Sequence, residues 1–166
     1  MRKRVMKNSS RFPDEKKLRI CLVASAGGHL TQLLKLAVSW SGHDCFYVVT
    51  SPLVRKELER NGRVYVVGEC NRLHPFRVLM VFFRCIRILL RERPHVVIST
   101  GAAAGCIECF LSKLIGAKVI WVDSITNVEK LSLSGRMVRH IADMFFVQWP
   151  SLTKNYSNTE YAGSVI

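Results

Sequence analysis

Long uncharged apolar runs are missing from this sequence, although apolar residues make up 49% of it. No such run reaches the roughly 18 to 20 residues that a membrane-spanning helix needs, so we expect no membrane span. The basic start is not followed by an apolar segment and a cleavage site, so we also expect no secretory signal. Most of the six cysteines lie inside apolar runs, and we expect free thiols in a reducing compartment.

Acidic side chains are also scarce, because 12 Asp and Glu face 25 Lys and Arg, which gives a formal net charge of +13. This excess indicates an anionic partner: nucleic acid, acidic lipid or a phosphate-bearing substrate. Many of the basic residues lie in 1–17, which we predict to be a flexible basic arm ahead of a single domain, 18–166. The sequence lacks RNA-binding motifs, a recognition-helix signature and aromatic–basic interleaving, so we expect no nucleic-acid partner.

Two familiar kinds of cofactor site are absent as well. Cys106 and Cys109 have the spacing of a zinc knuckle, but no second Cys or His pair complements them, so we expect no metal. The dinucleotide fingerprint G-x-G-x-x-G is missing too. We therefore expect no bound cofactor.

The sequence does contain a regular alternation of short apolar runs and helical segments. Near-continuous apolar runs are typical of strands buried on both faces of a parallel sheet. The predicted strands are 18–24, 45–50, 64–67, 95–99, 118–122 and 144–147, and the predicted helices are 30–40, 52–61, 75–91, a segment ending near 115, and 135–142. This order predicts an α/β fold with a Rossmann-like doubly wound parallel sheet, whose ligands bind beyond the carboxyl ends of the strands.

Small-residue turns follow the first and fourth predicted strands, at 25–29 and 99–105. Glycines let backbone N–H groups approach a ligand closely, and a helix N-terminus favours an anion. Two such turns in one sheet suggest a phosphate-binding cleft. His29 is a candidate hydrogen-bond donor to a phosphate or sugar oxygen, or a candidate catalytic base. Tight strand–helix packing without a ligand is the alternative for both turns. The candidate substrate-binding residues here are Ser25, Gly27, Gly28, Thr100 and Gly101.

A polar segment, 123–130, follows the fifth predicted strand. Asp123 and Glu129 are candidate catalytic bases, and their spacing does not choose between them. Ser124 and Asn127 are candidate substrate-binding residues in the same segment. Ordinary loop capping is the alternative for all four.

The predicted helix 75–91 carries arginines at helical spacing on an otherwise apolar cylinder. Such a helix suits the bilayer interface, where arginines meet lipid phosphates and large apolar side chains enter the acyl boundary. The alternatives are a core helix with an exposed basic edge and a helix covered by a partner subunit. The candidate membrane-binding residues are Phe76, Arg77, Phe82, Phe83, Arg84, Arg87 and Arg91.

Several short motifs occur in a characteristic order along the chain. They are Ser25-Ala26-Gly27-Gly28-His29-Leu30, Asp123-Ser124, Leu131-Ser132-Leu133-Ser134-Gly135, Ala142-Asp143 and Val147-Gln148-Trp149-Pro150. From about residue 18 onward the chain resembles the membrane-anchor subunit of the eukaryotic dolichol-linked UDP-GlcNAc transferase. It also resembles bacterial PssD, CpsF and EpsE-type subunits of exopolysaccharide assembly.

The resemblance implies that two short proteins together form one GT-B glycosyltransferase. This chain would be the acceptor-side half, peripheral on the cytoplasmic face of a membrane and inactive alone. A donor-binding partner subunit would hold most of the UDP-sugar, and no metal would be needed. Gly27, Gly28 and His29 would form one loop facing the pyrophosphate of a lipid-linked acceptor, and 100–105 the second. The alternatives are a non-catalytic membrane scaffold and a nucleotide-binding domain with its own small substrate.

Overall fold

A single parallel sheet organises the computed structural model, which describes residues 17–70 and 73–165. The predicted basic arm therefore lies, apart from Lys17, outside the described residues. The strand order is β3-β2-β1-β4-β5-β6-β7, and every pairing is parallel. The strands are β1 (Arg19–Ala24), β2 (Asp44–Val49), β3 (Arg63–Val66), β4 (Val96–Ser99), β5 (Lys118–Val122), β6 (Met144–Val147) and β7 (Glu160–Tyr161).

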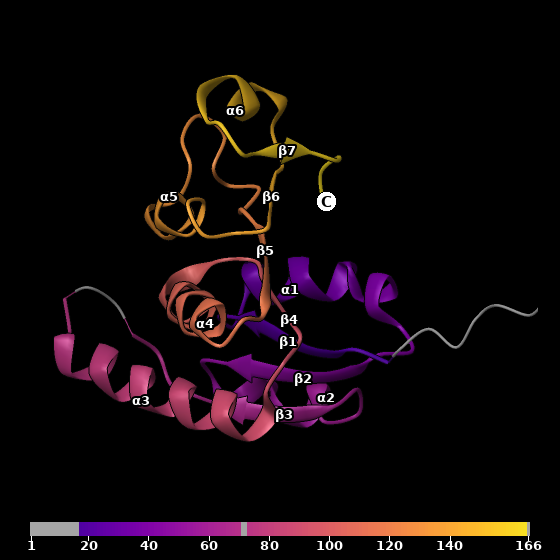
Figure 1. Cartoon of the computed structure of the whole chain (residues 1–166), viewed down its shortest axis with the longest axis vertical. Coiled ribbons are helices and arrows are strands. Elements are labelled where there is room, and N and C mark those ends of the chain that lie inside the picture. Colours follow the sequence, from indigo (N-terminus) through magenta and orange to yellow (C-terminus); the bar gives the residue numbers. More distant parts are fainter. Residues whose placement is uncertain (1–16, 71–72, 166) are drawn as a thin grey trace, which may run out of the picture.

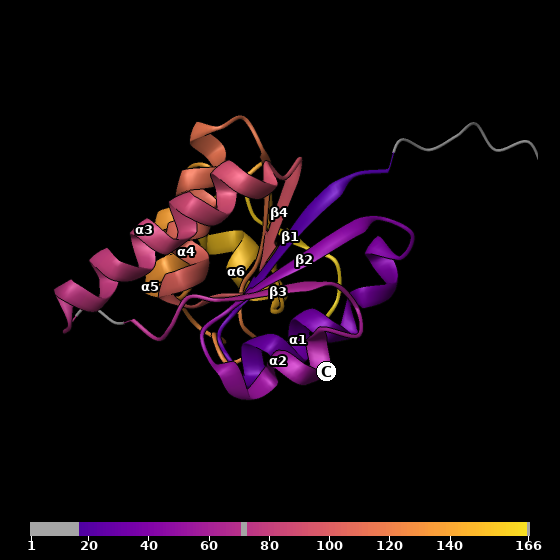
Figure 2. The same cartoon turned by 90° about the horizontal axis from the view of Figure 1, so that it is seen from below.

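Helices lie on both faces of this sheet (Figures 1 and 2). α3, α4 and α5 cover one face, while α1 and α2 cover the other beside β1, β2 and β3. This confirms the predicted doubly wound α/β fold. The helices are α1 (Gly28–Lys35), η1 (Ala37–Trp40), η2 (Pro52–Val54), α2 (Arg55–Leu58), α3 (Pro75–Glu92), α4 (Ala102–Leu114), α5 (Leu133–Val138) and α6 (Pro150–Asn155).

Alternation along the strands creates two hydrophobic cores. In β1, Cys21 and Val23 pack under α3 and α4, whereas Ile20 and Leu22 pack under α1. Successive side chains of a strand point to opposite faces, so a strand buried on both faces must be apolar throughout. This explains the uninterrupted apolar run of β1.

The structure differs from several of the predicted elements. The predicted helix 30–40 is divided into α1 and η1, and α4 begins at Ala102, inside the segment predicted to be a turn. The predicted helix 135–142 is α5, which begins earlier and ends at Val138. Finally, α6 and β7 were not predicted, because six and two residues are too few to show a clear period.

One acidic side chain lies inside the core between β1, α3 and α4. Glu108 is fully buried, and its Oε1 is 3.8 Å from Cys21 Sγ. Its Oε2 has no hydrogen-bond partner among the residues that the structure describes. Burial raises the pKa of Glu108 to about 7, against the smaller lowering effects of hydrogen bonds from Cys85 and Cys21. All six cysteines are free thiols, as predicted.

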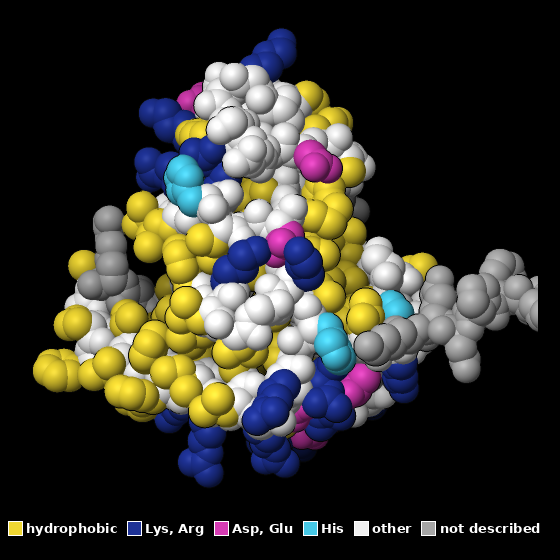
Figure 3. Space-filling model, viewed as in Figure 1, with side chains coloured by type: hydrophobic (Ala, Val, Ile, Leu, Met, Phe, Trp, Pro, Cys, Tyr) yellow, Lys and Arg dark blue, Asp and Glu magenta, His cyan; other side chains and the backbone are white. Residues whose placement is uncertain are grey.

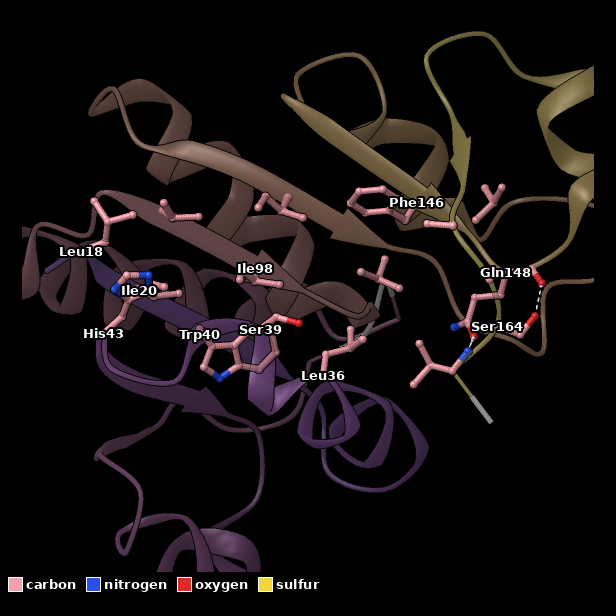
Figure 4. A pocket seen from close by; sticks show the side chains of 17 residues that line it. Leu18, Ile20, Leu36, Ser39, Trp40, His43, Ile98, Phe146, Gln148 and Ser164 are labelled. Carbon is pink, nitrogen blue, oxygen red and sulfur yellow. Dashed lines mark hydrogen bonds between the residues drawn. The ribbon is translucent and has the colours of Figure 1, made fainter. Parts of the chain in front are cut away.

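Within residues 17–70 and 73–165, no helix lies over half of one sheet face. The apolar side chains that β4, β5 and β6 present there form the floor of a groove of about 580 Å³ (Figure 4). One wall comes from η1, including Trp40, and the other from the C-terminal segment 162–165. This uncovered half is unusual, because parallel sheets are normally covered on both faces.

Candidate functional site

The two predicted turns meet at the carboxyl edge of the sheet. β1 and β4 are neighbours, with Val23 beside Ser99, so the turns that follow them emerge side by side. His29 Nδ1 lies 2.7 Å from the carbonyl oxygen of Thr100, and Thr100 Oγ1 donates to the carbonyl of His29 over 2.7 Å. In this strand order, β1 and β4 flank the topological switch point, where such folds bind ligands.

The contact with Thr100 fixes the protonation pattern of the His29 ring. A carbonyl oxygen only accepts hydrogen bonds, so Nδ1 must be the donor. In the neutral ring, Nε2 then carries the lone pair and is free to accept a proton. His29 is half-buried at the start of α1, where a ligand still reaches it. The geometry therefore suits a positioned base.

Two helix N-termini open at this edge without side-chain caps. Gly27 precedes α1 with φ +95°, and Gly101 precedes α4 with φ +137°. The first bond of α1 runs from Thr31 N to Gly27 O, so the preceding N–H groups have no acceptor within the helix. Uncapped N-termini of this kind attract anions.

Gly28 is exposed, and a Cβ added to it would meet nothing within 4 Å. Its φ is not in the left-handed region either, so neither packing nor backbone conformation requires a glycine here. The fold therefore does not explain the glycine. Without a side chain at this position, a ligand can approach the backbone closely.

The second turn is more tightly constrained. A Cβ on Gly101 would lie 2.4 Å from His29 Cε1, and one on Gly105 would lie 2.1 Å from Ser99 Oγ. Ala102, which follows Gly101, also has a positive φ of 68°. For a non-glycine residue this conformation costs roughly 1 kcal/mol. Gly105 therefore permits close helix–strand packing, while Gly101 admits the His29 ring.

Asp123 lies at the end of β5, is 1% exposed and accepts four hydrogen bonds. The donors to Oδ1 are Trp121 Nε1 at 3.1 Å and Ser132 Oγ at 2.8 Å. The donors to Oδ2 are Asn127 Nδ2 at 3.0 Å and the Ser132 backbone N–H at 3.2 Å. A Cβ on Gly135 would lie 2.7 Å from Asp123 Oδ1, which explains the glycine of the Leu131–Gly135 motif. The carboxylate organises this loop.

The other predicted residues of the sheet edge differ in exposure. Ser124 is 7% exposed, and its hydroxyl lies 3.0 Å from Thr126 Oγ1. Ser25 is half-buried between β1 and the first turn. Glu129 is exposed, and no side-chain hydrogen bond or ion pair joins it to the residues that the structure describes.

The sequence reasoning overlooked a buried pair of glutamines at this edge. Gln148, just after β6, donates from Nε2 to Gln32 Oε1 of α1 at 2.8 Å and to the Asp123 carbonyl at 2.9 Å. Its Oε1 accepts from Val165 N at 2.7 Å, and its carbonyl accepts from Ser164 Oγ at 2.7 Å. The signal was a polar residue within an otherwise apolar motif, 147–150.

An apolar face lies away from the turns, along α3 and α4. α3 buries Val81 and Cys85 against the core and exposes all four of the predicted arginines. Phe76 is 83% exposed and Phe83 61%, whereas Phe82 is half-buried against the core. Figure 3 shows hydrophobic side chains gathered over α3. The apolar face comprises Phe76, Leu79, Phe83 and Leu90 of α3 with Phe110 and Leu114 of α4.

The described residues contain no membrane-spanning helix and no cluster of metal-binding side chains. None of the helices found there is long and apolar enough to pass through a bilayer. Within the same ranges, 17–70 and 73–165, no three His, Cys, Asp or Glu side chains are placed to share a metal ion.

Comparison with protein families gives a match over most of the chain. Residues 53–165 match the model of the family described as oligosaccharide biosynthesis protein Alg14 like. A mouse protein named UDP-N-acetylglucosamine transferase subunit ALG14 is 28% identical over 90% of this chain and 83% of its own length. The human protein of that name has the same identity and coverage, and the one from Candida albicans is 41% identical over 47% of this chain and 38% of its own length.

Solved structures share the fold at low sequence identity. MurG from Acinetobacter baumannii superposes with a TM-score of 0.71 at 16% identity, over 87% of this chain and 45% of its own. The UDP-GlcNAc 2-epimerase of Methanocaldococcus jannaschii gives a TM-score of 0.68 at 13% identity, over 89% of this chain and 46% of its own. The chain thus spans less than half the length of these proteins.

Proposed function

Because the chain belongs to the family of Alg14-like oligosaccharide biosynthesis proteins, we propose that it is the acceptor-binding subunit of a two-protein glycosyltransferase. The complete enzyme transfers a sugar from a UDP-sugar to a hydroxyl on a polyprenyl-pyrophosphate-linked acceptor. The relatives' names support UDP-GlcNAc as the donor. The mammalian and fungal relatives favour lipid-linked oligosaccharide over bacterial exopolysaccharide as the product.

One observation carries this proposal: two uncapped helix N-termini meet at the switch point and touch through His29 and Thr100. Together they offer free N–H groups and two helix dipoles to a single anion. The acceptor pyrophosphate has the charge and the oxygen acceptors to fill this space. Gly27 and Gly28, which are exposed, would let it approach the backbone, whereas the His29 ring occupies the space beside Gly101.

The reaction is a displacement at the anomeric carbon of the donor sugar. The acceptor oxygen forms the new bond to this carbon, and the bond to the β-phosphate of UDP breaks, with its electron pair leaving on UDP. The proton of the acceptor hydroxyl goes to a base. We assign this role to His29 Nε2, because Nδ1 is occupied by Thr100. Asp123 already accepts four hydrogen bonds, so we assign it to positioning the 123–132 loop, with exposed Glu129 as the second candidate base.

The second protein is supported by what this chain leaves uncovered. A GT-B cleft needs two domains, and the described residues contain one sheet. Among the described residues, no helix lies over the groove floor on β4, β5 and β6. A partner that supplies the donor-binding half would account for this uncovered floor.

The membrane is the other partner in the proposal. Exposed phenylalanines and leucines on α3 and α4 would enter the acyl boundary, while Arg77, Arg87 and Arg91 would meet lipid phosphates. Each such arginine contributes about 1 kcal/mol near an anionic surface. We place the chain at the cytoplasmic face, where anionic lipids concentrate.

Reconstitution with the donor-binding subunit tests the proposal. Gly28→Ala should keep or slightly raise thermal stability, because alanine favours a helix and its methyl group meets no neighbour, yet acceptor KM should rise at least tenfold. His29→Asn retains a donor for the Thr100 carbonyl but removes Nε2, so kcat should fall at least tenfold with assembly intact. Lys35→Ala, later in α1, is the control. Full activity in both test variants would favour the scaffold alternative.

A further inference from the structure

Gln148 connects three separate parts of the molecule from a buried position. It is 2% exposed, and its side-chain nitrogen uses both N–H groups, one toward Gln32 of α1 and one toward the carbonyl of Asp123. Its side-chain oxygen accepts a hydrogen bond from the backbone N–H of Val165 in the C-terminal segment. A primary amide presents two donors and an acceptor at the same time, so a glutamine of this reach fits these three partners.

Gln32 places this network next to the first turn. It lies three residues after His29, which is about one helical turn, and it is 8% exposed. The first turns of α1 are thus held at two points: His29 bonds to Thr100 after β4, and Gln32 bonds to Gln148 after β6. Without the second bond, α1 can shift over the sheet while its contact with β4 remains.

We propose that Gln148 is a positioning residue that sets the first acceptor turn through Gln32 and α1. This rests on the proposed function, since the turn matters only if it binds the acceptor. Misplacement of a binding group by about 1 Å from a distant change can cost up to a hundredfold in rate. Acceptor binding should therefore respond to Gln148, while donor binding, which resides mainly on the partner, should not.

The test is steady-state kinetics of the reconstituted pair with Gln148→Met, which keeps the side-chain length and removes all three hydrogen bonds. Acceptor KM should rise about tenfold while the KM for UDP-GlcNAc stays within twofold. Gln32→Met should reproduce the rise, and the double variant should be no worse than the stronger single variant. Gln32→Met also provides the test if Gln148→Met does not fold.

Asp143→Asn is the matched control for general destabilisation. It removes ion pairs with Lys113 and Lys118 at the opposite edge of the sheet, so it lowers stability without touching α1. Acceptor KM should be unchanged in this variant. A wild-type acceptor KM in Gln148→Met, or an equal rise in Asp143→Asn, would overturn the proposal.

A readout without activity separates this inference from the proposed function. Amide hydrogen exchange of residues 31–35, whose N–H groups are bonded within α1, should accelerate at least fivefold in Gln148→Met and not in Asp143→Asn, because only the former releases α1. If the wild-type pair transfers no sugar, the proposed function fails, and the exchange result still decides whether Gln148 holds the turn. Unchanged exchange in Gln148→Met would refute the coupling on its own.

Discussion

The two edges of the sheet are held together by different chemistry. At the amino edge, charges are paired: Arg19 and Arg63 contact Asp44, Arg63 also contacts Glu92, and Lys113 and Lys118 contact Asp143. At the carboxyl edge, neutral side chains and one carboxylate form hydrogen bonds to each other and to backbone groups. The edge proposed to bind an anion thus keeps its helix N-termini unpaired, while the opposite edge neutralises its charges internally.

Gly101→Ala should break the carboxyl edge most severely. The methyl group would lie 2.4 Å from the His29 ring, and φ at this position is +137°. Strain and the displaced ring together should lower the free energy of unfolding by about 3 kcal/mol and abolish transfer. Urea denaturation and the reconstituted assay measure both effects. Gly116→Ala has a positive φ but open space, so a smaller loss there would show that the His29 contact, and not φ alone, is responsible.

A pair of equivalent substitutions compares the two edges directly. Asp123→Asn replaces one acceptor oxygen with an NH₂ group that faces hydrogen-bond donors, so it should lower the free energy of unfolding by about 1–3 kcal/mol. Asp143→Asn loses partly exposed ion pairs and should lower it by about 0.2–1 kcal/mol. Chemical denaturation at pH 7 gives both values. Equal costs would contradict the view that the carboxyl edge depends on its single carboxylate.

Acid should reduce the cost of Asp143→Asn. Burial alone would raise the pKa of Asp143, but hydrogen bonds from Lys113, the Val119 N–H and Lys118 hold it well below its usual range. A carboxyl group whose pKa is lowered in the folded state stabilises the fold at pH values above its unfolded-state pKa, about 3.9. This stability is lost as the pH falls through the folded-state pKa. The difference between wild type and Asp143→Asn should therefore shrink below about pH 4.

A pH-dependent effect is expected in the interior, between the two edges. The pKa of Glu108 is raised by burial to about 7, from a usual value of 4.5. Because the folded state binds this proton more tightly, stability is fully present below the unfolded pKa and falls as pH rises toward about 7. Glu108→Gln should match wild type near pH 5 and exceed it at pH 8 in thermal denaturation. Identical pH profiles of the two proteins would show that ionisation of Glu108 does not destabilise the fold.

Local patterns predicted the fold and the two turns that meet at the carboxyl edge of the sheet. Alternating apolar runs revealed the strands, and the glycines at 27 and 28 marked the turn after β1. The arginine spacing predicted the exposed side of α3 because it depends only on the helical period. The second turn was predicted too long, because Gly101 alone redirects the chain and Ala102 already belongs to α4.

Roles that depend on distant contacts were not readable from the sequence. Asp123 was predicted as one of two candidate bases, with loop capping as the alternative, and its four donors come from Trp121, Asn127 and Ser132, which the fold brings together. The bond between Gln148 and Gln32 spans 116 residues, and no local pattern reports it. The hydrogen bonds of a side chain are formed only in the folded loop. A sequence motif therefore identifies a carboxylate such as that of Asp123 but does not show whether its oxygens already accept hydrogen bonds from the protein.

The apolar face on α3 and α4 and the groove beside η1 lie on opposite sides of one sheet. A bilayer that holds the helices leaves the groove turned toward water, so lipid and protein never compete for the same surface. The turns at the rim then lie between the two. An acceptor anchored in the bilayer would need to bend around the end of the sheet. The distance between its lipid and its first sugar would then determine which acceptors fit the site.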